Sequence, residues 1–247
     1  VAGSEEAFVQ AMNREAQRLG LKNTRFANST GLSDPQHYST ARELGTLAAA
    51  LIRDFPEHYP LYSQREYTYN RITQANRNRL LWSDPAVDGV KTGHTESAGY
   101  CLIASAKRGP RRLLSVVMGA ASDGMRMQES QKLLNFGFQF FDAVKLYAAD
   151  QEVSRLRVWK GAQNTVKAGF LEDFTLSLPK GVAEKVKASL TSRQPLVAPV
   201  QKGQRVATLQ LTLDDKPYGE YPVVALETVP VAGMIGRAWD TMRLWFE

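Results

Sequence analysis

The sequence lacks a second cysteine, and only three of its 247 residues are histidines. A lone Cys101 excludes a disulfide within the chain, and its place in an apolar run predicts a small buried hydrophobic side chain. His37, His58 and His94 show no paired spacing of the kind that metal ligands have. We therefore expect no metal site.

Long hydrophobic runs are also absent. The longest, Leu44–Ile52, is interrupted by Gly45 and Thr46 and is far shorter than the ~20 residues that a membrane span needs. The 18 glycines and 11 prolines follow no short period, and the chain has no internal repeat of solenoid length. These absences exclude fibrous, low-complexity and helical membrane-spanning proteins, and they leave one large or two smaller globular domains.

Acidic residues are in the minority. The chain has 25 Asp and Glu against 31 Lys and Arg, which gives a net charge of +6 and a pI of about 9.4. This balance favours acidic partners, among them nucleic acid, anionic lipid and substrates that carry a carboxylate. The basic cluster between Lys107 and Arg112 lies at a turn between two expected strands, where we interpret it as a solvated surface. No nucleic-acid-binding motif is found, so we expect no nucleic-acid partner.

Helical and strand patterns follow one another in the first part of the chain. Ser4 and Thr40 are capping residues ahead of apolar residues at helical spacing, which predicts two helices. Turn-rich clusters separate three apolar stretches, which predicts an antiparallel three-stranded meander over residues 87–95, 100–106 and 113–118. A further amphipathic helix is expected over roughly 130–145, packed on the sheet. Together these elements indicate an α+β fold.

The second part of the chain has a different texture. Short alternating segments such as Phe174–Leu178 and Ala207–Leu213 predict a small all-β domain over about 150–229, after a first domain over 1–146. Residues 230–247 hold two of the four tryptophans, and at helical spacing their apolar side chains share one face, with Leu244 as the exception on the opposite face. We expect an amphipathic helix that lies on a membrane surface, the alternative being a core helix packed on the β-rich domain.

The tripeptide Lys91-Thr92-Gly93, followed by His94, lies in an expected strand. A Lys-Thr-Gly strand is one of the three motifs of the serine acyl-transfer site in penicillin-binding proteins and class A β-lactamases, beside Ser-x-x-Lys and Ser-x-Asn. The residue types suit that chemistry. The lysine raises the positive potential beside an attacking serine, the threonine hydroxyl can bind a substrate carboxylate, and the glycine leaves room for a ligand backbone at the strand edge.

Longer stretches agree with this motif. The runs Asn28–Glu43, Asn76–Leu81 and Val87–Thr95 resemble, in order and spacing, the D-alanyl-D-alanine carboxypeptidases among the low-molecular-mass penicillin-binding proteins. The β-rich second domain and the terminal amphipathic segment resemble the members that are similar to penicillin-binding protein 5. The resemblance implies part of a penicillin-binding or β-lactamase-like transpeptidase domain, an antiparallel sheet with helices, followed by a small all-β domain.

The resemblance also implies roles for particular residues. Lys91 would be catalytic, and Thr92, Gly93 and His94 would contact the substrate. Arg77 aligns with an arginine that holds the terminal carboxylate of the substrate, a task that suits a guanidinium fork. Arg126 falls at another position near the site.

The activity implied is removal of the terminal D-Ala from the pentapeptide of peptidoglycan, through a serine acyl-enzyme that water hydrolyses. β-Lactams would acylate the same serine because they resemble acyl-D-Ala-D-Ala. The partners implied are the peptidoglycan stem peptide, β-lactams and a membrane surface, and the location implied is the periplasm, at the inner membrane. No metal or organic cofactor is implied.

One departure from the family is large. The serine of Ser-x-x-Lys and the Ser-x-Asn motif precede the aligned region in the family, and neither motif appears before Lys91. The chain opens on Val-Ala-Gly without an initiator methionine, so we expect a processed product or the C-terminal portion of a longer protein. Ser177-Leu178-Pro179-Lys180 matches Ser-x-x-Lys as a string, but its proline opposes the helical turn that would join serine and lysine.

Two other functions stay open at this point. A class A β-lactamase would share Lys-Thr-Gly, but it gives no reason for the β-rich domain or the terminal amphipathic segment. A non-catalytic protein that binds or organises the cell envelope would agree with the absence of the nucleophile. The sequence upstream of Val1 would distinguish them, because the two serine motifs there would indicate the enzyme.

Overall fold

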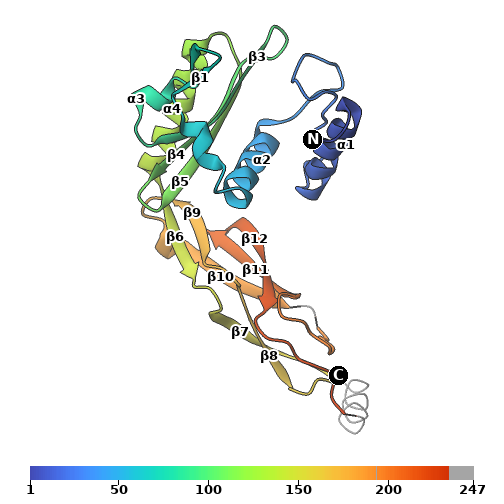
Figure 1. Cartoon of the computed structure of the whole chain (residues 1–247). Helices are drawn as coiled ribbons and strands as arrows, with labels where there is room; N and C mark the ends of the chain where they lie inside the picture. Colours follow the sequence, from blue (N-terminus) through green and yellow to red (C-terminus); the bar gives the residue numbers. More distant parts are fainter. Residues whose placement is uncertain (193, 234–247) are drawn as a thin grey trace. The chain divides into compact units, whose positions relative to one another are not determined.

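The computed structural model describes residues 1–192 and 194–233. The chain divides into two compact units, Val1–Gln139 and Phe140–Glu247, whose helices and strands are labelled in Figure 1. The first unit mixes helices with antiparallel strands, and the second is built mainly of strands. The α+β fold and the all-β part that follows it are therefore confirmed.

The first unit is organised around one antiparallel sheet. In chain order it contains α1 (Glu5–Arg18), α2 (Ala41–Asp54), the 3-10 helix η1 (Tyr59–Ser63), β1 (Glu66–Tyr69), β2 (Ile72–Ala75), α3 (Leu80–Ser83), β3 (Val87–Thr95), β4 (Gly99–Arg108), β5 (Arg111–Ala120) and α4 (Asp123–Phe140). The sheet has the order β3-β4-β5, so the predicted meander is confirmed and β3 is an edge strand of this sheet.

Helices cover both faces of this sheet (Figure 1). Alternate residues of β4, among them Leu102 and Ala104, point towards one face and form a buried cluster with Leu134 and Phe138 of α4. On the other face α2 approaches β5, where Gly45 lies against Val116. These apolar contacts fix β4 between the helices, and β4 in turn pairs with β3.

Cys101 lies on the α2 face and is only partly buried, which corrects the expectation of a buried side chain. A small cavity of about 170 Å³ between α2 and the sheet leaves it accessible. Its sulfur lies 3.5 Å from the carbonyl oxygen of Ala98.

The two predicted helix starts are confirmed by their caps. The Ser4 hydroxyl accepts a hydrogen bond from the backbone N–H of Ala7 at 3.1 Å, and the Thr40 hydroxyl accepts one from Glu43 at 3.2 Å. Glu43 in turn is buried, and its carboxylate accepts hydrogen bonds from Asn23 and Thr24. These bonds hold the segment between α1 and α2 against the start of α2.

The third helix differs from its prediction. Helix α4 runs over Asp123–Phe140 rather than 130–145, because the Ser122 hydroxyl caps the helix seven residues early. At the other end, residues Phe141–Tyr147 form strand β6, which pairs with β9 (Phe174–Pro179). The partner strand supplies backbone hydrogen bonds that the sequence pattern of 141–145 does not reveal. The division between the units accordingly falls after Gln139 and not at 146.

The sequence also gave no sign of the hairpin formed by β1 and β2. Its turn residues Asn70 and Arg71 have φ values of 48° and 62°, in the left-handed region. All eight strand residues are exposed, so the alternation of buried and exposed positions that predicts a strand is missing.

The second unit contains β6, β7 (Glu152–Arg157), β8 (Thr165–Gly169), β9, the 3-10 helix η2 (Ala183–Lys185), β10 (Val186–Ser192), β11 (Arg205–Leu213) and β12 (Lys216–Ala225). Five strands form a sheet of order β10-β11-β12-β8-β7, and β6 pairs with β9. Val166, Leu178 and Val223 are fully buried members of its core. The predicted strands 174–178 and 207–213 are confirmed. The predicted terminal helix falls largely on residues 234–247, outside the described residues.

Candidate active site

A polar cavity of about 970 Å³ opens in the first unit where several parts of the chain meet. β3 contributes the Lys-Thr-Gly motif, the segment between β2 and α3 contributes arginines, and the start of α4 contributes an acid and an arginine. The residues that line it are Thr30, Gly31, Gln74, Ala75, Asn76, Arg77, Arg79, Lys91, Thr92, Gly93, His94, Tyr100, Asp123 and Arg126. The structure thus brings all the site residues expected from the sequence to one cavity.

The Lys-Thr-Gly motif lies on the free edge of the sheet. Lys91, Thr92 and Gly93 pair on one side with β4, and their other backbone edge faces away from the sheet. The Lys91 ammonium donates to the carbonyl oxygen of Thr92. An edge strand of this kind can accept an extended peptide as a further strand.

The segment before α3 places Arg77 at the cavity. Its side chain is exposed, and within residues 1–192 and 194–233 no carboxylate forms an ion pair with it. The neighbouring Asn78 is 2% exposed, so one side chain points to the cavity and the next points into the protein. Arg77 is therefore a cation available for an anionic ligand.

Positive charge dominates the cavity wall. Arg77, Arg79, Lys91 and Arg126 face a single acid, Asp123, which lies 2.9 Å from Arg79 and 2.5 Å from Arg126. The pKa of Lys91 is lowered, first by partial desolvation and then by the positive charges of Arg77 and Arg126. A bound carboxylate would relieve this repulsion, so the electrostatics favour an anionic ligand.

Arg126 has a different environment from Arg77. It is 5% exposed, and its guanidinium donates to the carbonyl oxygens of Gly93 at 3.0 Å and Cys101 at 3.3 Å. Its charge reaches the cavity, but its hydrogen bonds hold the ends of β3 and β4 together. The ring of His94 lies against that of Tyr100 in a tilted arrangement, with 4.0 Å between the ring centroids and 36° between the ring planes.

Several residues of the cavity were missed by the sequence reasoning. Arg79, Asp123 and Tyr100 are not part of a recognisable sequence motif. They are connected with Lys91 only because the fold places them in the same cavity. Thr30 and Gly31 come from the loop between α1 and α2, which a 2.9 Å hydrogen bond between Ser33 and Ser97 ties to the β3–β4 turn. In the sequence, only the family resemblance of the run Asn28–Glu43 indicated that this loop belongs to the site.

No serine lines this cavity within the part of the chain that the structure describes. Ser177 and Pro179 lie in the extended backbone of strand β9 of the second unit, and Lys180 follows the end of that strand. The prediction that the string Ser177–Lys180 forms no helical Ser-x-x-Lys turn is confirmed. Among the described residues no cluster of three or more potential metal ligands occurs, and no helix there is long and apolar enough to cross a bilayer.

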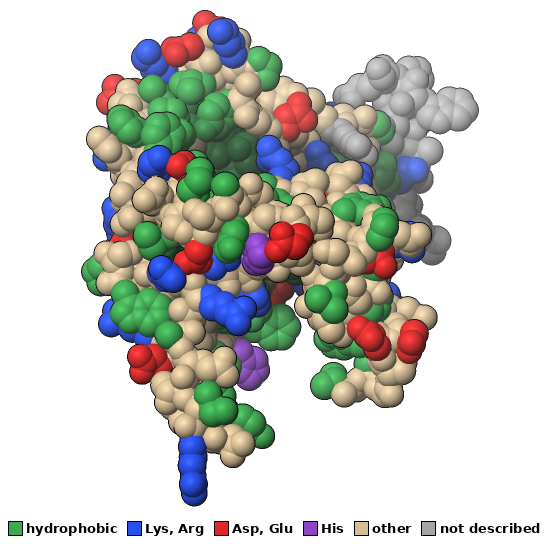
Figure 2. Space-filling view, turned by 90° about the horizontal axis from the view of Figure 1, so that it is seen from above, with side chains coloured by type: hydrophobic (Ala, Val, Ile, Leu, Met, Phe, Trp, Pro, Cys, Tyr) green, Lys and Arg blue, Asp and Glu red, His purple; other side chains and the backbone are tan. Residues whose placement is uncertain are grey.

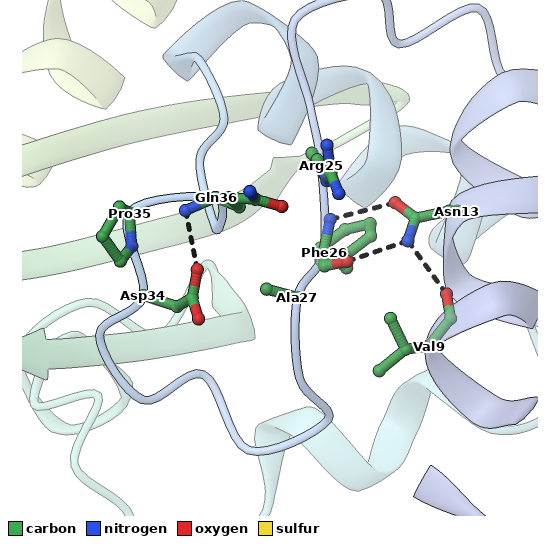
Figure 3. Close-up of a pocket in the computed structure, with 8 residues that line it drawn as sticks. All are labelled: Val9, Asn13, Arg25, Phe26, Ala27, Asp34, Pro35 and Gln36. Atoms are coloured by element: carbon green, nitrogen blue, oxygen red, sulfur yellow. Dashed lines mark hydrogen bonds between the residues drawn. The ribbon is translucent and has the colours of Figure 1, made fainter. Parts of the chain in front are cut away.

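A second hollow, of about 510 Å³, lies between α1 and the segment 25–36 (Figure 3). The Asn13 amide makes three hydrogen bonds in its wall. It donates to the carbonyl oxygens of Phe26 and Val9 at 2.8 and 3.1 Å, and it accepts from the backbone N–H of Phe26 at 3.0 Å. These polar groups satisfy one another, and the wall contains no residue of the Lys-Thr-Gly motif. The larger basic cavity is therefore the candidate site. On the face of the molecule drawn in Figure 2, Lys and Arg side chains lie beside His side chains.

Comparison with known proteins agrees with this assignment. The D-alanyl-D-alanine carboxypeptidase family matches residues 1–122, and the C-terminal domain of penicillin-binding protein 5 matches residues 141–231. The D-alanyl-D-alanine carboxypeptidase DacC of Escherichia coli is 45% identical over 248 residues, which cover 100% of this chain and 62% of DacC. The chain thus spans about three fifths of the length of the curated relatives it matches.

Solved structures give the same result. Penicillin-binding protein 5 of Haemophilus influenzae superimposes with a TM-score of 0.82 at 42% identity, over 93% of this chain and 68% of that one. Penicillin-binding protein D2 of Listeria monocytogenes, solved with cefotaxime bound, has a TM-score of 0.50 at 35% identity, over 53% of this chain and 55% of that one. With its fold, its Lys-Thr-Gly edge strand and its β-rich second unit, the chain belongs to the D-alanyl-D-alanine carboxypeptidase family, among the proteins similar to penicillin-binding protein 5.

Proposed function

We propose that this chain supplies the substrate-binding edge of a serine-type D-alanyl-D-alanine carboxypeptidase, and that the nucleophilic serine lies outside its 247 residues. The serine hydroxyl attacks the carbonyl carbon of the penultimate D-Ala, and the terminal D-Ala leaves with the proton. Water then hydrolyses the acyl-enzyme and releases the shortened stem peptide.

The observation that carries this proposal is the Arg77 guanidinium, which has no carboxylate partner among residues 1–192 and 194–233, beside the edge strand of Lys91. The cations of this cavity outnumber its acids. Arg77 would bind the terminal carboxylate of the substrate, and the Thr92 hydroxyl would add a second contact. The backbone at Gly93 would pair with the peptide, while His94 would border the leaving group. Arg126 would contribute positive potential and hold Gly93 in place.

Lys91 has the catalytic role in this proposal. Its ammonium would stabilise the negative charge that develops when the serine attacks. Desolvation and the charges of Arg77 and Arg126 lower the pKa of Lys91, and the negative charge of a bound carboxylate would favour its ammonium form again.

The same geometry supports covalent binding of β-lactams, which carry a carboxylate near a reactive amide. The structural relative from Listeria monocytogenes was solved with cefotaxime bound. In our proposal Arg77 and Thr92 hold the β-lactam carboxylate, and the serine is acylated.

We also propose that the protein works in the periplasm, attached to the inner membrane through residues 231–247. The support is the amphipathic pattern, in which Trp239 and Trp245 share the apolar face and two arginines balance two acids on the other. Attachment would then depend on apolar insertion and resist moderate salt. Deletion of 231–247 should release the whole protein from vesicles without loss of activity on a soluble peptide, whereas unfolding of the truncated protein would contradict an anchor.

The decisive experiment for the activity uses the whole protein with its serine motifs. Release of D-Ala from an acyl-D-Ala-D-Ala peptide, together with covalent labelling by a fluorescent penicillin, would support the proposal. Folded protein that does neither would favour the non-catalytic envelope protein instead. Rapid turnover of penicillin without release of D-Ala would favour a β-lactamase.

A further inference from the structure

The buried amide of Asn78 joins the segment that carries Arg77 to the strand that carries Lys91. Its Nδ2 donates to the carbonyl oxygen of Gly89 at 2.9 Å, and Gly89 lies two residues before Lys91 on β3. Its Oδ1 accepts from the backbone N–H of Leu80 at 3.3 Å, at the start of α3. The side chain is 2% exposed, so both bonds are shielded from water.

The Gly89 end of this link is rigid. A Cβ at Gly89 would come within 2.5 Å of the Tyr59 hydroxyl, so only glycine lets η1 pack this closely on β3. The preceding residue, Asp88, accepts hydrogen bonds from the Tyr59 hydroxyl at 3.0 Å and from Arg112 at 2.6 Å. The carbonyl that Asn78 binds is therefore fixed on the sheet.

The other side of Arg77 is anchored as well. The backbone N–H of Asn76 donates to Arg65 at 2.6 Å, and the Asn76 amide donates to the carbonyl oxygen of Gln64 at 2.9 Å. The Asn76 Oδ1 accepts from the backbone N–H of Asn78 at 2.9 Å. The Arg77 backbone is thus held from both sides, while its guanidinium has no carboxylate partner in the described residues.

We propose that Asn78 is a positioning residue that keeps the Arg77 guanidinium in register with the Lys91–Gly93 edge, and so sets the recognition of a ligand carboxylate. This inference rests on the proposed function, because it concerns the carboxylate contact at the same site. Asparagine can form both hydrogen bonds because its amide nitrogen donates to Gly89 and its amide oxygen accepts from Leu80. An aspartate would turn a second acceptor towards the Gly89 carbonyl.

The test is a double-mutant cycle in the whole protein, with Asn78→Ala, Arg77→Ala and the two changes combined. For each variant, kcat and KM are measured on an acyl-D-Ala-D-Ala peptide with a free carboxylate and on its C-terminal amide. We expect Asn78→Ala to lower kcat/KM on the free carboxylate by about tenfold or more, and by less than about twofold on the amide. In the Arg77→Ala background the further loss should vanish.

Asn13→Ala is the matched control. It removes a similar set of amide hydrogen bonds in the same unit, but Asn13 does not line the basic cavity. It should lower the thermal midpoint and leave the ratio of the two kcat/KM values unchanged. Asn78→Asp, which keeps the shape and the acceptor for Leu80, provides a second variant and should lose the same preference for the carboxylate.

The outcomes are separable. Equal losses on both peptides, or losses that add in the double variant, would overturn the role of Asn78 while leaving the proposed function intact. If Arg77→Ala itself fails to distinguish the two peptides, the carboxylate assignment fails, and the role of Asn78 fails with it. If neither Asn78 variant folds, the side chain is needed for the fold alone and the positioning role is rejected.

Discussion

Arg126 donates a hydrogen bond of 3.0 Å to the carbonyl oxygen of Gly93, the last residue of the Lys-Thr-Gly motif. The same nitrogen lies 3.3 Å from the carbonyl oxygen of Cys101, directly across the strand pair. A buried cation from α4 therefore binds two paired strands where they border the cavity. This contact separates the role of Arg126 from that of Arg77, although both are arginines of one cavity.

The first prediction follows from this contact. Arg126→Ala leaves two carbonyl oxygens without their charged donor and should reduce the free energy of unfolding by about 1.5–3 kcal/mol. In the whole protein it should also slow β-lactam acylation and slow turnover of free-carboxylate and amidated peptides alike. Urea unfolding and acylation rates measure the two effects, with Arg14→Ala on exposed α1 as the control. A loss confined to free-carboxylate peptides would instead indicate direct binding.

The second prediction concerns Lys91. Lys91→Ala in the whole protein removes the ammonium beside the attacking serine and should nearly abolish labelling by a fluorescent penicillin. Labelling is read from a gel, and circular dichroism verifies that the variant folds. Undiminished labelling of folded protein would be incompatible with the assignment of Lys91.

The third prediction concerns Arg77. Arg77→Ala removes one charge-assisted contact and should cost about 1.5–3 kcal/mol in kcat/KM on peptides with a free carboxylate, with little effect on amidated ones. It also removes a positive charge that lowers the pKa of Lys91, so the alkaline limb of the pH profile should move to higher pH. Steady-state kinetics over a pH series test both statements. Arg71→Ala, at the exposed hairpin turn, should change neither.

The fourth prediction concerns residues 1–247 alone. Because no serine lines the cavity among the described residues, incubation of this chain with penicillin should give no covalent adduct. Intact-mass spectrometry decides the point, with the whole protein as the positive control. An adduct mapped to Ser177 or to another serine of this chain would refute the proposal that the nucleophile lies elsewhere.

The fifth prediction is a pH dependence of stability. Burial raises the pKa of Tyr59 to about 12, whereas an unfolded chain ionises a tyrosine near pH 10. The raised pKa adds no pH dependence below about pH 10. Between pH 10 and 12 the unfolded state loses this proton while the folded state keeps it, so stability falls as the pH rises.

Tyr59→Phe should make this decline shallower, and loss of the hydrogen bond to Asp88 should cost about 1 kcal/mol at neutral pH. Urea unfolding at pH 8, 10 and 11 is the measurement. Tyr67→Phe, on the exposed hairpin, is the control that should leave both quantities unchanged. An identical alkaline decline in the wild type and in Tyr59→Phe would contradict the assignment.

The three-stranded meander, the capped starts of α1 and α2 and the β-rich second part could all be predicted from the amino-acid sequence. Each depends on a periodicity or a cap that neighbouring residues carry. The Lys91-Thr92-Gly93 motif was visible for the same reason, since its three residues are consecutive on one strand. Arg77 needed the resemblance to a family as well, because one arginine in a polar segment has no local signature.

The contacts between these parts could be found only in the folded protein. The strand β6 replaced the expected end of α4 because it pairs with β9, from Phe141 opposite Pro179 to Tyr147 opposite Phe174, and this partner is distant in the sequence. The links from Asn78 to Gly89 and from Arg126 to Gly93 join residues 11 and 33 positions apart. Such contacts arise when separate elements bury their apolar faces against one sheet. Local sequence patterns indicate which face of a helix or strand is apolar, but they do not specify which polar groups come into contact when those faces pack.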